Sequence, residues 1–186
     1  HDKIIVAYMS STGASGAYYV ACAANKIIAN PGTVVGSIGV VAEFINYTEL
    51  MEWAKIKDVI FKTGEFKDTG NPTRPLTERE RTYFQGLIDD MYVQFVDAVA
   101  AGRSMDLQEV RALPDGRVFT GRDGKEKKLI DEIGNFQDAV DLTAKLAGIS
   151  GKPRLLRPVR QRVTLLDVLT TDLSSLPPFS GRSLKS

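Results

Sequence analysis

The stretch Thr12-Gly13-Ala14-Ser15-Gly16-Ala17-Tyr18-Tyr19 decides how the rest of the chain is organised. An apolar run over residues 3–9 precedes it and predicts a buried strand, and small and apolar residues over 14–24 predict a helix. Ser15 is therefore expected at a strand-to-helix turn, where the helix N–H groups can stabilise an oxyanion and Gly16 is the expected donor. The alternative is that Ser15 only caps the helix, and these eight residues alone favour that alternative.

The composition limits which chemistry can accompany Ser15. The chain has 186 residues, a formal net charge of +1, one cysteine and one histidine. This length fits one domain with a core, and the near-neutral charge gives no reason to expect a nucleic-acid partner. The histidine is His1, at a terminus, so a Ser-His-Asp triad and a zinc site are both excluded as predictions, and no metal or cofactor is expected. Cys22 is expected as a small buried hydrophobe.

Predicted strands alternate with predicted helices along the chain, which indicates an α/β fold. The predicted strands are residues 3–9, 26–29, 33–41, 58–62, 117–121 and 129–133, and the predicted helices are 14–24, 47–55, 106–113 and 135–146, together with a basic helical turn over 124–129. A long amphipathic helix starts at the capping box Thr77–Glu80 and is expected to end near Gly102. Its aromatic stripe predicts core or a subunit interface.

Two segments offer further candidates for a site. Residues 33–41 are β-branched and punctuated by glycine, which fits either a bulged core strand or an edge that an extended peptide joins. Gly36, Ile38 and Gly39 are the candidate groove residues on the second interpretation. The loop over 63–72 carries Lys67, whose alternative is a solvated surface charge. Asp68 beside it is either an ion-pair partner of Lys67 or a loop cap, and the cap is favoured.

The ends of the chain carry their own expectations. Residues 1–150 are expected to form the folded core, and residues 151–186, which are basic and rich in serine and proline, a C-terminal extension. The chain opens on His1-Asp2 and enters a predicted core strand at once, so we expect it to be a fragment with a missing upstream part. No run of about 18 apolar residues predicts a membrane span.

Six motifs occur in one order along the chain. They are Ala14-Ser15-Gly16-Ala17-Tyr18-Tyr19, Asn30-Pro31-Gly32-Thr33, Gly36-Ser37-Ile38-Gly39-Val40, Thr63-Gly64-Glu65-Phe66-Lys67-Asp68, Asp115-Gly116-Arg117-Val118-Phe119-Thr120-Gly121 and Leu129-Ile130-Asp131-Glu132-Ile133-Gly134. Over about residues 3–147 this series resembles the signal peptide peptidase A family, the S49 serine peptidases. The resemblance implies an α/β fold of the crotonase/ClpP-like type, truncated here on its N-terminal side.

The same resemblance implies a function and a set of site residues. Ser15 matches the family's nucleophile, Lys67 its general base and Ser37 a hydroxyl that supports the lysine. The family implies an acyl-enzyme mechanism on peptides such as cleaved signal peptides, a ring- or dome-shaped homo-oligomer whose neighbouring subunits complete the site, membrane association through an N-terminal anchor, and a catalytic domain outside the cytoplasm. Ala17 departs from the family's usual second glycine, and we expect a tuned pocket from it.

Two other classes of function stay open at this stage. One is a crotonase-like enzyme that acts on acyl-CoA, which would bind CoA and would not need Lys67. The other is a non-catalytic assembly or scaffold fragment, which would leave Ser15 unreactive. On the peptidase interpretation, the fragment alone, without its upstream part, is expected to be inactive.

Overall fold

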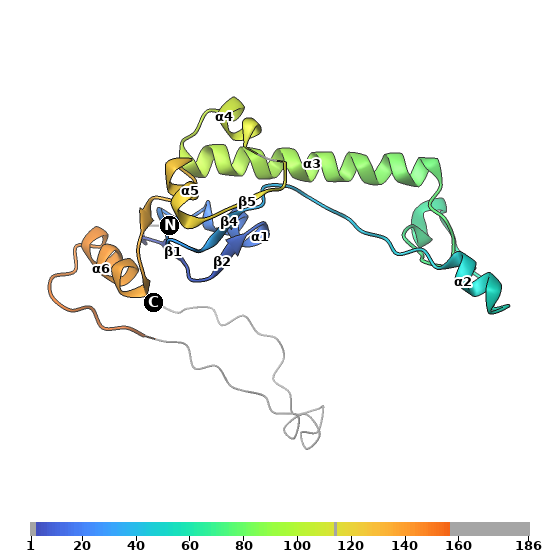
Figure 1. Ribbon diagram of the computed structural model, residues 1–186, viewed down its shortest axis with the longest axis horizontal. Helices are drawn as coiled ribbons and strands as arrows, with labels where there is room; N and C mark the ends of the chain where they lie inside the picture. The colour runs from blue at the N-terminus through green and yellow to red at the C-terminus, as the bar shows by residue number, and fades with distance from the viewer. Residues whose placement is uncertain (1–2, 114, 157–186) are drawn as a thin grey trace, which may run out of the picture. The chain divides into compact units, whose positions relative to one another are not determined.

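Two small sheets form the base of the protein in the computed structural model, which describes residues 3–113 and 115–156 (Figure 1). One sheet has the order β1–β3–β6, with β1 (Val6–Met9), β3 (Lys26–Ala29) and β6 (Glu132–Ile133) all parallel. The other has the order β2–β4–β5, in which β2 (Thr12–Ala14) is parallel to β4 (Val34–Gly36) and β5 (Val118–Phe119) is antiparallel to β4. These elements belong to the unit formed by residues 1–153.

The register of β2 and β4 fixes where the chain leaves this second sheet. Ala14 pairs with Gly36, the last residue of each strand. Ser15 and Ser37 follow directly, so the two serines leave the same edge of the sheet from neighbouring parallel strands. The carboxyl ends of parallel strands are where α/β proteins place their functional side chains.

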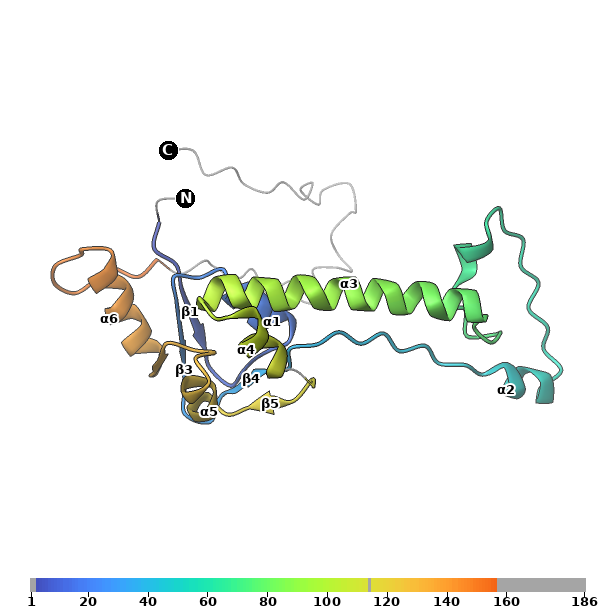
Figure 2. The same cartoon turned by 90° about the horizontal axis from the view of Figure 1, so that it is seen from above.

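Helices of very different lengths connect and cover the strands. They are α1 (Gly16–Ala21), α2 (Thr48–Trp53), the 3₁₀ helix η1 (Glu65–Asp68), α3 (Glu78–Arg103), α4 (Leu107–Ala112), α5 (Gly121–Glu126) and α6 (Phe136–Leu146). The C-terminal half of α3 packs on the core through Phe95, Val96 and Val99, which are at most 5 % exposed. The N-terminal half of α3 extends away from the sheets, and α2 and η1 lie beside its start in both views (Figures 1 and 2).

Tyr18 makes a buried polar contact among the apolar side chains of the core. Tyr18 is fully buried, and its hydroxyl donates a hydrogen bond of 2.7 Å to the main-chain oxygen of Leu129. Burial raises the pKa of Tyr18 far above its usual value, so the phenol stays protonated. Cys22 is buried as predicted, and burial raises the pKa of its thiol to about 11, which keeps it in the unreactive protonated form at neutral pH.

Several predicted elements are confirmed. The strand over residues 26–29 has the predicted bounds. The capping box is present: Thr77 Oγ1 accepts from the Glu80 N–H at 3.2 Å, and Glu80 Oε2 accepts from the Thr77 N–H at 2.8 Å. Asn135 caps α6 as its sequence position indicated.

Other predicted elements are wrong. Residues 58–62 form no strand. Among the described residues no strand lies beside them and Phe61 is 94 % exposed, and an isolated strand is not stable in water. The strand over 33–41 is only Val34–Gly36, and it lies between β2 and β5, so this part is a core strand and not a free edge. The first helix begins at Gly16, because Ala14 belongs to β2. The predicted strand over 129–133 is reduced to β6.

Gly102 does not end α3, as the sequence predicted, but lies inside its last turn. A Cβ at this position would lie 2.1 Å from the main-chain oxygen of Cys22, so the glycine permits close contact between α3 and the end of α1. The helix ends at Arg103, and Ser104 follows in the left-handed conformation with φ 50°.

Replacing Gly102 by alanine is therefore expected to lower the free energy of unfolding by about 2 kcal/mol, because the backbone clash outweighs the better helix propensity of alanine. Gly86 is the matched control in the same helix, since a Cβ there meets nothing within 4 Å. Gly86→Ala is expected to raise the free energy of unfolding by about 1 kcal/mol. Urea denaturation of both variants measures the difference, and equal effects would contradict the packing argument.

Candidate active site

Ser15 is held in a strained main-chain conformation between β2 and α1. Its φ of 54° and ψ of −127° lie in a region that non-glycine residues rarely adopt, and such conformations cost about 1–3 kcal/mol. Its N–H donates to the main-chain oxygen of Gly36 at 2.8 Å, and its own carbonyl oxygen accepts from the Tyr19 N–H at 2.9 Å. The hydroxyl makes no capping hydrogen bond to α1. Ser15 is thus at the N-cap position without acting as a side-chain cap.

The neighbouring Gly16 is the first residue of α1. The N–H groups in the first turn of a helix have no acceptor within that helix, and their dipoles point toward the residue before it. A Cβ built on Gly16 would meet nothing within 4 Å, so its backbone is open to an approaching group. This geometry is compatible with the predicted oxyanion donor, which stays a prediction.

Ser37 occupies the matching position after β4. It also has a positive φ, 51°, and its N–H donates to the main-chain oxygen of Arg117 at 2.9 Å. Gly36 before it has a φ of 83°, and a Cβ there would lie 2.7 Å from the ring of Phe119. Gly36 is buried in the sheet and does not line the pocket. Its main-chain oxygen accepts the hydrogen bond from the Ser15 N–H, which fixes the turn.

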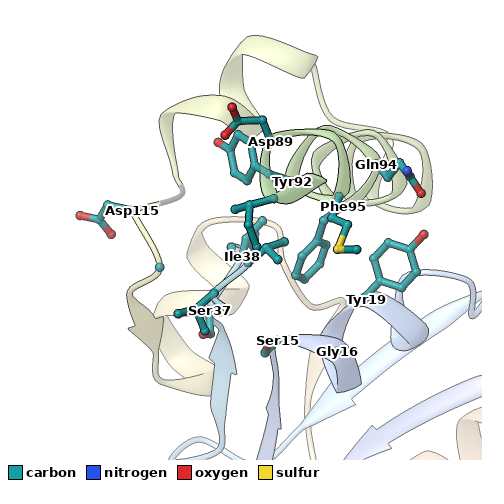
Figure 3. A pocket seen from close by; sticks show the side chains of 16 residues that line it. Ser15, Gly16, Tyr19, Ser37, Ile38, Asp89, Tyr92, Gln94, Phe95 and Asp115 are labelled. Carbon is teal, nitrogen blue, oxygen red and sulfur yellow. The ribbon is translucent and has the colours of Figure 1, made fainter. Parts of the chain in front are cut away.

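A pocket of about 770 Å³ opens over the two serines, between the ends of the strands and the side of α3 (Figure 3). Ile38 and Gly39 line it together with Val40 and Val41, and their part in a substrate groove stays a prediction. The residues that α1 and α3 contribute to its wall are mainly apolar and aromatic: Tyr19, Ile88, Met91, Tyr92 and Phe95. The rings of Tyr19 and Phe95 meet edge to face with their centroids 5.2 Å apart.

Polar side chains stand at the rim of this pocket. Asp115 is paired with Arg117, and the hydrogen bond from that guanidinium lowers the pKa of Asp115 to about 2. Asp89 accepts a hydrogen bond of 2.8 Å from the amide of Gln85. The pocket therefore has a mainly apolar wall, with the side chains of Asp89 and Asp115 among its polar lining residues.

The wall that α3 supplies was only partly foreseen from sequence. The aromatic stripe was interpreted as core or subunit interface, and Phe95 does belong to the core. Ile88, Met91 and Tyr92 line the pocket, and Tyr92 also packs against the core. The sequence feature that indicated a role beyond the core was the length of the aromatic stripe. The stripe continues toward the N-terminus of α3, beyond the part of the helix that the sheets can cover.

Lys67 lies in η1 and is exposed, and it is not among the residues that line the pocket. Its neighbour Phe66 packs against Tyr83, near the start of α3, with ring centroids 5.2 Å apart. About 18 Å of helix separates Tyr83 from Phe95, which is beside the pocket, at the α-helical rise of about 1.5 Å per residue. The structure therefore brings Ser15 and Ser37 together but leaves Lys67 apart from both within one chain.

Asp68 takes neither of the two roles considered from sequence, an ion pair with Lys67 or a loop cap. It forms ion pairs with Lys62 and Arg74, at 2.7 Å and 2.9 Å. These contacts hold the pKa of the Asp68 carboxyl well below its usual range, first through the hydrogen bond from Arg74. The carboxylate beside Lys67 is thus engaged by other cations.

Two other kinds of feature are absent from the described residues. Within residues 3–113 and 115–156, no group of three or more His, Cys, Asp or Glu side chains is placed to hold a metal ion. In the same described part of the chain, no helix is both long and apolar enough to cross a bilayer.

The elements above define an α/β protein whose pocket is centred on a serine at the ends of parallel strands. A family model described as Peptidase family S49 matches residues 1–150, and the chain belongs to this family. The predicted fold class, α/β of the crotonase/ClpP-like type, is confirmed with it.

Relatives from bacteria and a plant agree with this assignment. A protein of Synechocystis that is provisionally named as a protease is 40 % identical over 80 % of this chain and 54 % of its own length. A protein of Enterococcus faecium, provisionally named as a signal peptide peptidase, is 38 % identical over 77 % of this chain and 42 % of its own. The chloroplastic serine protease SPPA of Arabidopsis thaliana is 34 % identical over 94 % of this chain and 25 % of its own. The chain thus spans about half, or less, of the length of these relatives.

Proposed function

We propose that this chain is the catalytic part of a serine peptidase in which Ser15 attacks the peptide carbonyl and Lys67 of a neighbouring copy is the general base. The observation that carries the proposal is the strained turn at Ser15, whose hydroxyl is not used as a cap and which lines an apolar pocket. Strain of this kind persists where surrounding structure enforces it, and it is concentrated at functional sites.

The proposed chemistry uses groups of two copies of this chain and one water molecule. Lys67 takes the proton of the Ser15 hydroxyl as the oxygen bonds to the carbonyl carbon. The oxyanion that forms is stabilised by the Gly16 N–H at the start of α1. The same amine then gives its proton to the leaving nitrogen, and in the second half it activates water for hydrolysis of the acyl-enzyme. Ser37, beside Ser15, holds the amine by a hydrogen bond.

A lysine in water has a pKa of about 10.4 and is protonated at neutral pH, so Lys67 must be removed from water before it can act as a base, and a second copy would do this. Desolvation disfavours the ammonium, and Lys67 is exposed in the single chain. The segment that precedes it is also rich in uncovered apolar side chains: Val41, Ile45, Trp53, Val59 and Phe61 are 69–94 % exposed. Patches of this kind mark association surfaces. A neighbouring copy that covers this segment would bury Lys67 against a Ser15 pocket at the same time.

The proposed substrate is an extended peptide with an apolar side chain in the pocket, such as the remnant of a signal peptide. The apolar wall around Tyr19 and Phe95 supports the apolar preference. Residues 38–41 have no regular secondary structure and border the pocket, so their main chain is available beside Ser15 for a peptide strand. The provisional name of the Enterococcus faecium relative, signal peptide peptidase, agrees with this substrate class.

Covalent labelling tests the nucleophile and the base together. A fluorophosphonate probe is expected to modify Ser15 in the assembled protein, identified by mass spectrometry of the labelled peptide. Lys67→Ala is expected to slow the labelling about 100-fold or more, because the hydroxyl loses its base. Lys57→Ala is the control, since it removes another exposed lysine from the same segment. Labelling at Ser37 alone, or a rate that Lys67→Ala leaves unchanged, would overturn the proposal.

A further inference from the structure

Four charged side chains around η1 form a compact cluster, which we call the η1 cluster: Lys62, Asp68, Arg74 and Glu80. Two are cations and two are carboxylates, so its formal charge is zero. Resting on the proposed function above, we propose that Arg74 is a positioning residue of the Ser-Lys site: it neutralises Asp68, so that no free carboxylate holds Lys67 as an ammonium.

Arg74 is the centre of the η1 cluster. Its Nε and Nη2 atoms each donate to one oxygen of Asp68 at 2.9 Å, and its Nη1 donates to Glu80 Oε2 at 2.8 Å. It also donates to the main-chain oxygen of Asp68 at 3.3 Å, which ties the end of η1 to the guanidinium. A planar guanidinium can serve two carboxylates at once in this way, whereas an ammonium is a single point charge.

Glu80 anchors the η1 cluster to α3. It is 1 % exposed, and it accepts from Thr69 Oγ1 at 2.9 Å and from the Thr77 N–H at 2.8 Å. A buried carboxylate without a cation would be strongly unfavourable, so Arg74 is required there in its charged form. The contacts with Arg74 hold the pKa values of Glu80 and Asp68 far below their usual range. Both acids therefore stay ionised at every pH at which a peptidase would be assayed.

The consequence for Lys67 follows from its place in the chain, next to Asp68 within η1. A bare carboxylate close to an amine stabilises the ammonium and would prevent the amine from acting as a base. In this structure the negative charge of Asp68 is compensated by Arg74 on one side and by Lys62 on the other. The η1 cluster next to Lys67 therefore carries no net charge.

The other charged groups around this turn are also accounted for. Glu65, within η1, pairs with Arg79 of α3 at 2.8 Å, and Glu78 is 3.7 Å from Arg81. Asp58, in the segment before η1, accepts hydrogen bonds from Thr73 and Asn71. The Glu65 and Glu78 pairs are exposed and screened by solvent, and each carboxylate is compensated by its own cation.

The test is the pH dependence of fluorophosphonate labelling of Ser15 in the assembled protein. A base must be neutral, so labelling is expected to rise with pH along an acid limb. Arg74→Gln leaves two carboxylates with only Lys62, which favours the ammonium of Lys67. The acid limb is expected to move to higher pH by about one unit or more. Arg74→Lys keeps the charge without the forked contacts, and the acid limb is expected to return toward the wild-type position.

Two more variants separate electrostatics from folding. Lys62→Met removes the other cation, whose side chain is 35 % exposed, and is expected to move the limb in the same direction by less. Arg81→Gln removes an equal charge from the exposed surface of α3 and is expected to leave the limb in place. Slower labelling with an unmoved limb in both Arg74→Gln and Lys62→Met would reduce Arg74 to a structural role. Labelling that does not depend on Lys67 at all would instead remove the proposed function itself.

Discussion

Replacing Ser15 by alanine is expected to lower kcat/KM for a peptide substrate by about 10⁴-fold or more, while the protein still folds and assembles. The reason is that no other group in the described part of the pocket can take the place of the nucleophile: Ser37 leaves the sheet one strand away, and the remaining wall is mainly apolar. A quenched fluorescent peptide with an apolar side chain before the scissile bond measures the loss. Activity within a few-fold of the wild type would contradict the assignment of Ser15.

Ser15→Gly separates the chemistry from the strain. It removes the hydroxyl just as alanine does, but glycine adopts a φ of 54° with a ψ of −127° without the steric cost that a Cβ brings. We therefore expect Ser15→Gly to be as inactive as Ser15→Ala and yet more stable than it by about 1–3 kcal/mol. Thermal unfolding at equal protein concentration compares the two. If alanine and glycine gave equal stability, the turn would not be strained by its side chain.

Local signals in the sequence predicted local structure well. The capping box at Thr77 and the N-cap at Asn135 are satisfied by groups within three residues of each other, so no distant contact is needed to form them. The apolar run over residues 26–29 is a strand with neighbours on both sides. In each of these cases the residue and its partner, or its burial, agree with the intrinsic preference.

The failures share a different physical origin. Residues 58–62 have the composition of a strand, but pairing depends on a neighbour that sequence pattern does not supply. Gly102 was interpreted as a helix stop, yet its place is set by the main chain of Cys22, far away in sequence. Most of the predicted extension over residues 151–186, from residue 157 onward, lies outside the described residues, and the boundary at residue 150 stays a prediction.

The candidate site divides along the same line. Ser15 could be singled out from its neighbours, but its strained φ arises only because Ala14 pairs with Gly36 and the Ser15 N–H is bonded to the Gly36 oxygen. The part that Arg74 takes was not visible either, because its two carboxylates become neighbours only when the segment folds back on α3. The sequence around Lys67 does not indicate how far this residue lies from Ser15, and within a single chain the two residues stay apart.

Mixing two inactive variants is expected to restore activity, and this is the sharpest consequence of that separation. In a Ser15→Ala subunit Lys67 is intact, and in a Lys67→Ala subunit Ser15 is intact. If each site uses Ser15 of one copy and Lys67 of the next, random co-assembly of equal amounts regenerates about a quarter of the wild-type sites. Co-refolding of the two variants, with each tagged differently to prove mixed assembly, measures the recovery as peptide turnover.

The control for this experiment mixes Ser15→Ala with the double variant that lacks both Ser15 and Lys67, and no site can be regenerated there. Recovery in the first mixture alone would place the base on a neighbouring copy, in agreement with the exposure of Lys67 and its distance from the pocket along α3. Mixed assemblies that form and stay inactive would mean that Lys67 serves Ser15 of its own chain or does not serve it at all. The first of these would require η1 to leave its contacts with Arg74 and Tyr83, a rearrangement that hydrogen exchange at the start of α3 would detect.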